Sequence, residues 1–160
     1  MPVARVYVSV IGAGDAEPAA LDVADQVGRE LARRGAIVVC GGRGGVMEAA
    51  SRGAQEAGGT TVGILPDGDR SHANPYLDIA LPTGMGELRN GLVARAGDAV
   101  IAVGGEFGTL SEIAFALKLG RPVVGLRSWE LARAGEPVDA IVAANTPAEA
   151  VTRALELAGA

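Results

Sequence analysis

The sequence predicts an α/β fold: a Rossmann-like, doubly wound parallel sheet with helices on both faces, in three α/β/α layers. Short apolar runs alternate along the chain with longer amphipathic segments, an order typical of repeated β-α-β units. The apolar runs are continuous, as strands that are buried on both faces require. Glycine clusters stand where apolar runs pass into helical segments, which is where a doubly wound fold binds ligands.

Helices are predicted where apolar residues recur every three or four positions. The first has Leu21, Ala24, Val27 and Leu31 on one face, and Gly35 ends it. The next follows a long glycine cluster and ends at a glycine pair. The predicted helices cover residues 17–34, 46–57, 84–96, 109–119 and 147–157.

Strands are predicted for the apolar runs between these helices. They cover residues 3–11, 36–40, 60–65, 77–81, 99–103, 122–126 and 141–143. A polar loop is expected over residues 66–76, and residues 127–138 match neither pattern. Because no linker or low-complexity segment interrupts the chain, we predict one Rossmann-like nucleotide- or phosphate-binding domain over residues 1–160.

Composition narrows the possible functions. The formal net charge of −5 argues against a nucleic-acid partner, which favours a basic face. Lys118 is the only lysine and lies late in a helical segment, so neither a Walker phosphate loop nor a pyridoxal-phosphate Schiff base is expected. With one cysteine, Cys40, and one histidine, His72, we expect no disulfide and no metal site. No apolar run is long enough to span a membrane and no signal peptide is recognisable, so we expect a cytoplasmic protein without a membrane partner.

Two glycine-rich loops are the main candidates for a ligand site. The first contains Gly41, Gly42, Arg43 and Gly45, and the second contains Gly104, Gly105 and Gly108. Each leads into a helix, whose free backbone N–H groups and partial positive charge suit an anion such as phosphate. The alternative is that glycine only makes the turn. Gly12 ends the first strand, but Gly12-x-Gly14 lacks the third glycine of a dinucleotide fingerprint.

Three charged residues near these loops are candidates for chemistry. Arg89 and Arg95 stand six residues apart on one predicted helix, about 240° around its axis, so they do not share a face. Either guanidinium suits a phosphate or a carboxylate, and either also fits a surface ion pair. Glu112 fits an acid or base in the cleft, or half of a capping box in which Thr109 caps the helix and Glu112 bonds back to its N–H.

Other polar residues in these loops have open roles. Glu106 would repel a phosphate unless it points away or pairs with an arginine, and Arg43 is either that partner or a phosphate ligand itself. His72 and Asn74 lie in the long polar loop, which is a candidate lid.

The stretch 104–112, Gly-Gly-Glu-Phe-Gly-Thr-Leu-Ser-Glu, resembles the Pro-Gly-Gly-x-Gly-Thr-x-x-Glu motif of the lysine-decarboxylase-like, or LOG-like, superfamily. Its characterised members are cytokinin-activating phosphoribohydrolases. Arg89-Asn90 resembles that family's Arg-Lys helix motif, and Arg95 matches its next arginine. The stretch 41–47 resembles its Gly-Gly-x-x-Gly-x-Met motif, so the likeness extends over residues 3–126.

The resemblance implies a homodimer or higher homo-oligomer that splits the N-glycosidic bond of a nucleoside 5′-monophosphate, releasing base and ribose 5-phosphate. It implies that Arg89 and Glu112 form the catalytic pair, with Arg95 in support. A carboxylate near an oxocarbenium-like transition state is chemically sensible. It further implies that the ligand site includes Met47, Asn90, Gly105, Gly108 and Thr109.

Three departures from the motif point to a sister branch that includes molybdenum-cofactor carrier proteins: Asn90 replaces Lys, Gly104 replaces Pro and Glu106 replaces Gly. In that branch the cleft holds a phosphorylated pterin. We therefore predict a protein that binds a nucleotide-like phosphorylated ligand, either a nucleoside monophosphate or the molybdenum cofactor (molybdopterin), and requires no other cofactor. The alternative is a phosphoribohydrolase. Lysine decarboxylation is not predicted, because no lysine is placed for its cofactor.

Overall fold

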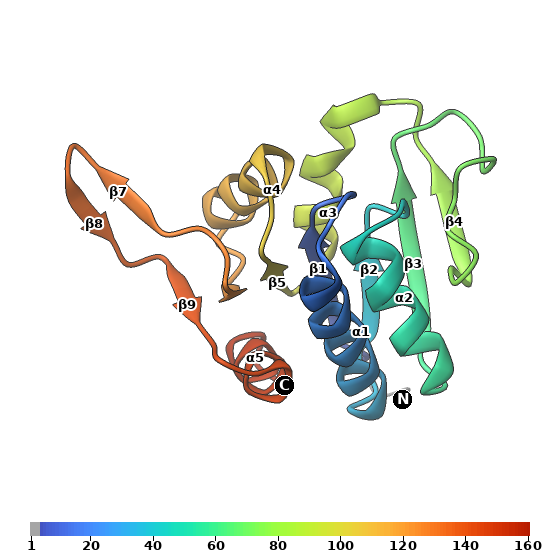
Figure 1. Cartoon of the computed structure of the whole chain (residues 1–160), viewed down its shortest axis with the longest axis horizontal. Coiled ribbons are helices and arrows are strands. Elements are labelled where there is room, and N and C mark those ends of the chain that lie inside the picture. Colours follow the sequence, from blue (N-terminus) through green and yellow to red (C-terminus); the bar gives the residue numbers. More distant parts are fainter. Residues whose placement is uncertain (1–3) are drawn as a thin grey trace.

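The computed structural model describes residues 4–160 and contains a seven-stranded parallel sheet with strand order β4-β3-β2-β1-β5-β6-β9 (Figure 1). The sheet strands are β1 (Tyr7–Gly12), β2 (Ile37–Cys40), β3 (Thr60–Leu65), β4 (Ile79–Pro82), β5 (Ala99–Val103), β6 (Val123–Leu126) and β9 (Ile141–Ala143). The helices are α1 (Pro18–Arg33), α2 (Val46–Glu56), the 3-10 turn η1 (Gly86–Arg89), α3 (Asn90–Ala96), α4 (Phe107–Lys118) and α5 (Pro147–Leu157). The predicted Rossmann-like α/β class is confirmed.

The predicted elements differ from the observed ones in two places. The helix expected over residues 84–96 is divided into η1 and α3. Residues 127–138, which matched neither pattern, contain the short antiparallel hairpin β7 (Leu131–Arg133) and β8 (Glu136–Val138), which projects from the body in Figure 1. The predicted start of the first strand at residue 3 lies outside the described residues.

The helices form two layers because each face of the sheet is apolar. Helix α1 packs against α2 and α5, and α3 packs against α4. One apolar cluster joins α1, α2 and α5 to alternate residues of the strands, such as Val8, Val10 and Ile101. The second joins α3 and α4 to the intervening residues, such as Ile11 and Val100. The alternation follows from the period of two in a strand, and it explains why the strand sequences are apolar without interruption.

The chain order creates a crevice at the carboxyl edge of the sheet. After β1 the chain fills one side with β2, β3 and β4, and it then returns to place β5, β6 and β9 on the other. Strands β1 and β5 are therefore neighbours from which the chain departs in opposite directions. At such a switch point the loops separate, and ligands of open α/β sheets bind there.

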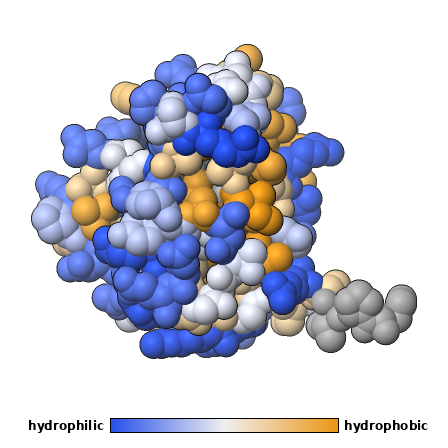
Figure 2. All heavy atoms as spheres, turned by 90° about the vertical axis from the view of Figure 1, so that its right-hand side faces the viewer, coloured by the Kyte–Doolittle hydropathy of each residue, from blue (hydrophilic) through white to orange (hydrophobic). Residues whose placement is uncertain are grey.

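The β4 edge of the sheet carries an apolar surface. Figure 2 shows this side of the molecule, where apolar atoms gather in the middle of a hydrophilic surround. Ile79 and Leu81 are the large exposed apolar residues of β4. Arg70 Nε donates to the Ala80 carbonyl oxygen at 2.9 Å, so part of the open edge is occupied by the chain's own loop. Among residues 4–160, no helix has the length and apolar character needed to cross a membrane.

Helices α1 and α2 approach each other through two glycines. A Cβ added at Gly28 would lie 1.9 Å from the Ala50 carbonyl oxygen, and one at Gly53 would lie 2.0 Å from the Asp25 carbonyl oxygen. Both are backbone atoms, so neither clash is relieved by a rotamer change.

We expect Gly28→Ala to lower the free energy of unfolding by about 2 kcal/mol, because the helices must move apart. Gly91→Ala in α3 is the matched control, since its Cβ would lie 3.7 Å from the Phe115 ring, an ordinary contact. That variant should be neutral or slightly stabilising through helix propensity. Urea unfolding of both measures the difference, and equal stability of the two variants would contradict the close approach.

Candidate functional site

The first glycine loop connects β2 to α2 and is packed tightly against its surroundings. Added Cβ atoms at Gly12, Gly41, Gly42 and Gly45 would lie 2.6, 2.6, 2.5 and 2.2 Å from neighbouring heavy atoms. At Gly41 the obstacle is the Arg89 guanidinium, and at Gly45 it is the Ala13 carbonyl oxygen. The Val46 N–H donates to that same carbonyl at 3.0 Å, which ties the loop after β2 to the loop after β1. These glycines are therefore required by packing, whether or not a ligand binds.

The second glycine loop connects β5 to α4 and contains one glycine of a different kind. Gly104 and Gly105 have φ of 54° and 110°, in the region that favours glycine. Gly108 has no positive φ, and a Cβ there would meet nothing within 4 Å. It lies exposed in the first turn of α4. The fold does not need a glycine at this position, and its absent side chain leaves the N-terminus of the helix open to an approaching group.

The capping box predicted for Thr109 and Glu112 is wrong. Helix α4 begins at Phe107 with Glu106 as N-cap residue, and no side chain accepts a capping hydrogen bond there. Both Thr109 and Glu112 lie inside the helix and are buried. The spacing of a capping box is also that of two residues on one helical face, and here the second arrangement occurs.

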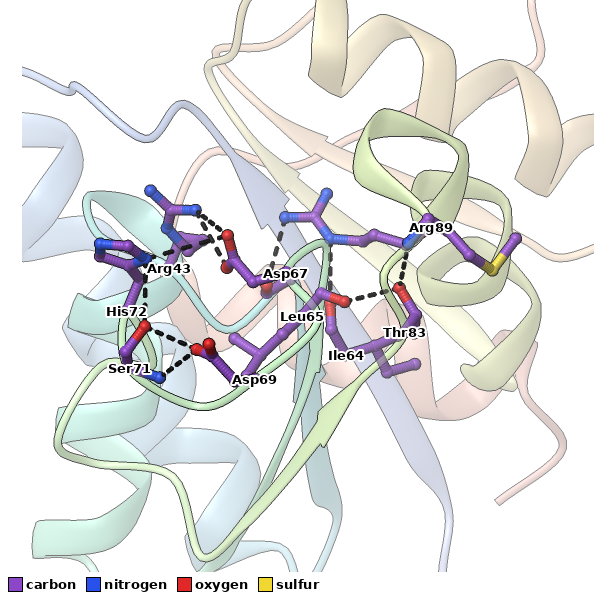
Figure 3. Close-up of polar contacts among 11 residues, drawn as sticks. Arg43, Ile64, Leu65, Asp67, Asp69, Ser71, His72, Thr83 and Arg89 are labelled. Atoms are coloured by element: carbon purple, nitrogen blue, oxygen red, sulfur yellow. Dashed lines mark hydrogen bonds and ion pairs between the residues drawn. The ribbon is translucent and has the colours of Figure 1, made fainter.

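Arg89 is held by the main chain of two neighbouring strands. The side chain is at the end of η1 and the residue is only 9% exposed. Its Nε donates to the Ile64 carbonyl oxygen at 2.9 Å, its Nη2 donates to the Gly41 carbonyl oxygen at 3.1 Å, and its Nη1 donates to Asn90 Oδ1. In Figure 3 the guanidinium extends across the strand ends toward these carbonyl groups. Arg89 thus closes the gap between β3, the first glycine loop and α3.

Asn90 continues this network to the second glycine loop. Its Nδ2 donates to Ser111 Oγ at 3.1 Å, and Ser111 Oγ donates to the Gly108 carbonyl oxygen at 2.6 Å. A lysine at position 90, as in the LOG-like motif, offers only donors, whereas Asn90 accepts from Arg89 and donates to Ser111. The replacement therefore suits a hydrogen-bonded bridge between the two loops.

Glu112 is a buried carboxyl group on α4, and the residue is 7% exposed. Loss of solvation raises the pKa of Glu112 to about 8, while the nearby positive charge of Arg89 opposes the shift. Burial in turn lowers the pKa of Arg89, and the Glu112 charge opposes that shift. At neutral pH Glu112 is mostly protonated, so it is available as a proton donor and contributes little negative charge.

Arg43 pairs with Asp67, and the proposed pairing with Glu106 is not observed. Arg43 Nη1 lies 3.1 Å from Asp67 Oδ2, and His72 Nδ1 lies 3.9 Å from Asp67 Oδ1 (Figure 3). Asn74 Nδ2 donates to the Arg43 carbonyl oxygen at 3.1 Å, and its N–H donates to the Gly42 carbonyl oxygen at 2.9 Å. The predicted polar loop 66–76 is therefore attached to the first glycine loop.

Two further candidates are placed differently. Met47 lies in the first turn of α2, where its Sδ would be 2.7 Å from a Cβ at Gly41, so it borders the first loop. Arg95 is exposed in the last turn of α3, about 9 Å along the helix from Asn90. The structure does not bring Arg95 together with Arg89 and Glu112, and its supporting role stays a prediction.

Sequence reasoning missed the segment after β6. A cavity of about 480 Å³ is lined by Gly104, Gly105, Glu106, Arg127, Ser128, Trp129 and Glu130. Nothing in the periodicity marked this segment, although Trp129 is the only tryptophan in the chain. Among residues 4–160, no group of three His, Cys, Asp or Glu side chains is arranged to hold a metal ion.

Comparison with known proteins identifies the family. The model of the SLOG cluster4 family matches residues 5–151. The chain belongs to the SLOG cluster4 family. This SLOG cluster4 protein is 43% identical to an uncharacterized protein of Archaeoglobus fulgidus over 122 residues, which cover 76% of this chain and 80% of that protein. The resemblance to the LOG-like superfamily, on the side of the molybdenum-cofactor carriers, is confirmed.

Two other relatives have informative names. A molybdenum cofactor binding protein from Rippkaea orientalis superposes with a TM-score of 0.89 at 35% identity, covering 96% of this chain and 98% of that chain. A probable cytokinin riboside 5′-monophosphate phosphoribohydrolase from Oryza sativa is 36% identical over 91 residues, which are 55% of this chain and 37% of that protein. The SLOG cluster4 protein thus has a fold-wide match to a cofactor-binding protein and a partial match to a hydrolase.

The buried Glu112 makes the stability of the protein depend on pH. Its pKa in the folded state is above the ordinary value of 4.5, so between pH 4.5 and about 8 the folded state binds more protons than the unfolded state. The contribution is fully present below pH 4.5 and is lost as the pH rises through 8.

We expect Glu112→Gln to remove this dependence, because glutamine stays neutral. From pH 5 to pH 8.5 the wild type should lose on the order of 3 kcal/mol more than the variant. Denaturant unfolding at several pH values measures the two slopes. Parallel slopes would show that Glu112 is ionised in the folded protein.

Proposed function

We propose that this SLOG cluster4 protein binds a nucleotide-like phosphorylated ligand, a nucleoside monophosphate or the molybdenum cofactor, and holds it without cleaving it. The proposed site is the carboxyl edge of the sheet, with the phosphate at the N-terminus of α4. The main support is Gly108: neither its backbone angles nor its neighbours require glycine, and a side chain there would block the helix N-terminus.

The geometry of Arg89 and Glu112 favours carriage over cleavage. Three nitrogens of Arg89 already donate to groups of the protein, so this guanidinium is a strut of the site. Glu112 is mostly protonated at neutral pH, and an uncharged carboxyl group gives little stabilisation to an oxocarbenium-like transition state. The name of the Rippkaea orientalis protein, which matches over nearly the whole chain, agrees with this proposal.

A phosphoribohydrolase is the second candidate. It is favoured by the position of Glu112 close to Arg89 in the register of the LOG-like motif, and by the match to the rice protein. A carboxyl group with a pKa near 8 could protonate a leaving base.

The deciding experiment combines binding with product analysis. AMP, GMP and molybdopterin are added separately, melting temperatures are recorded, and free base is measured by chromatography. We expect stabilisation without free base. Free base that disappears in Glu112→Gln would establish the hydrolase in place of the carrier, and the absence of any thermal shift at millimolar ligand would reject both.

Gly108→Ala tests the position of the phosphate. Without ligand the variant should be more stable by about 0.5–1 kcal/mol, because alanine favours the helix. The ligand-induced rise in melting temperature should nevertheless fall sharply, since the methyl group obstructs the helix N-terminus. Gly91→Ala, also a helical glycine with ordinary contacts, should keep the full ligand response. An unchanged response in Gly108→Ala would place the phosphate elsewhere.

We further propose that the protein forms a homodimer through the outer surface of η1, α3 and α4. Its large exposed apolar residues are Met85, Leu88, Leu92, Phe115 and Leu119. Leu88 is 73% exposed, and helices α3 and α4 lie side by side. A contiguous apolar surface of this kind is typical of a subunit interface.

Leu88→Glu should convert the dimer to a monomer, because it places a charge in the apolar interface. Leu157→Glu, on α5 and 49% exposed, is the control and should leave the mass unchanged. Sedimentation equilibrium measures both. A wild-type protein that sediments as a monomer would refute this interface.

A further inference from the structure

A second part of the carboxyl edge lies beyond the loop of α4, on the side of β6. The cavity of about 480 Å³ between residues 104–106 and 127–130 adjoins one of about 750 Å³ beneath the β7–β8 hairpin, and Arg127 lines both. Strand β5 stands between β1 and β6, so this region is about 10 Å from the β1 side of the crevice. One phosphorylated heterocycle is long enough to touch both.

The segment that forms this cavity is fixed to the second glycine loop. Ser128 Oγ donates to the Gly104 carbonyl oxygen at 2.6 Å, and the Gly104 N–H donates to the Leu126 carbonyl oxygen at 3.0 Å. Arg127, between these attachments, has a φ of 48°, a conformation that costs energy in a residue with a side chain. Its exposed guanidinium forms no ion pair within residues 4–160 and stands next to the proposed phosphate position.

Aromatic side chains gather at the cavity although they are rare in the chain. Phe107 and Trp129 are two of five aromatic residues in the sequence, and their ring centroids are 5.8 Å apart with an interplanar angle of 36°. Phe107 is 77% exposed, which is unusual for a ring unless it contacts something outside the chain. Such a pair offers a surface on which a planar heterocycle can stack.

The hydrogen-bonding groups around the rings are complementary to one type of heterocycle. The indole N–H of Trp129 is buried without a partner among the described residues, whereas buried indole N–H groups normally have one. Glu106 and Glu130 line the same cavity and are exposed carboxylates. One unpaired donor beside two acidic acceptors calls for a ligand with a carbonyl oxygen next to N–H groups.

We propose that Glu106, Trp129 and Glu130 bind the 2-amino-4-oxopyrimidine ring shared by guanine nucleotides and pterins. The ring stacks on Phe107 and Trp129, its carbonyl oxygen accepts from the indole N–H, and its N–H groups donate to a carboxylate. Arg127 contacts the phosphate. Adenine has no carbonyl oxygen and presents its donor where this ring has an acceptor, so it does not fit. This inference rests on the proposed function, because the phosphate is taken to lie at α4.

The experiment compares GMP, IMP, AMP and neopterin by titration calorimetry, with Trp129 emission as a reporter of this location. IMP keeps the carbonyl group and lacks the 2-amino group. We expect GMP to bind about tenfold or more tightly than AMP, IMP to lie between them, and both GMP and neopterin to change the emission. Tighter binding of neopterin than of guanosine would identify the pterin as the source of the ring, and the reverse would identify the nucleotide.

Variants separate the contacts. Glu106→Gln and Glu130→Gln should each be tested, and at least one should reduce GMP affinity to that of IMP. Trp129→Phe keeps a ring and removes the N–H, so it should weaken GMP and IMP and leave AMP unchanged. Glu136→Gln, at the exposed hairpin, is the control. Equal affinities for GMP and AMP, or binding without a change in emission, would overturn this inference and leave the proposed function standing. Failure of all four ligands to bind would overturn both.

Discussion

The buried guanidinium of Arg89 holds the ligand edge of this protein together. It bonds to carbonyl groups that follow β2 and end β3, and to Asn90, which passes the connection to Ser111 and the second glycine loop. A guanidinium removed from water must have its donors satisfied, so each of these groups fixes the position of the others. Gly41 is glycine because the guanidinium occupies the space of its Cβ. The shape of the cleft therefore depends on one side chain that does not need to touch the ligand.

Burial also sets the charge of the site. Arg89 keeps its proton, while desolvation leaves Glu112 mostly neutral at physiological pH, so the pair does not behave as a simple ion pair. Arg43 is compensated by Asp67 on the polar loop. The cationic charge left at this edge is that of Arg127 and the N-terminus of α4, on the other side of the crevice. A protein of net charge −5 can thus receive an anion locally without an extended basic surface.

These two regions divide the work between phosphate and ring. The α4 end of the crevice offers an open helix N-terminus at Gly108, and the β6 end offers aromatic surfaces with hydrogen-bonding groups around them. Fold-wide similarity to a molybdenum cofactor binding protein and a partial match to a phosphoribohydrolase are compatible with one ancestral phosphate site. The substitution of lysine by asparagine at position 90 is what a bridge between loops needs, and it offers no charge to a reacting substrate.

The sequence by itself determined the layers, the strand limits and the edge of the sheet where the glycine loops lie. Continuous apolar runs and helical periodicity depend only on neighbours along the chain, so Thr60–Leu65, Ala99–Val103 and Pro147–Leu157 could be predicted residue by residue. Tertiary structure decided the rest. Only folding shows that Arg43 meets Asp67, that Glu112 is buried beside Arg89 and not a cap, that Gly108 is unneeded by packing, and that Trp129 borders the second loop. Partners, pKa shifts and cavities arise from residues far apart in the chain, and local patterns hold no information on which of them meet.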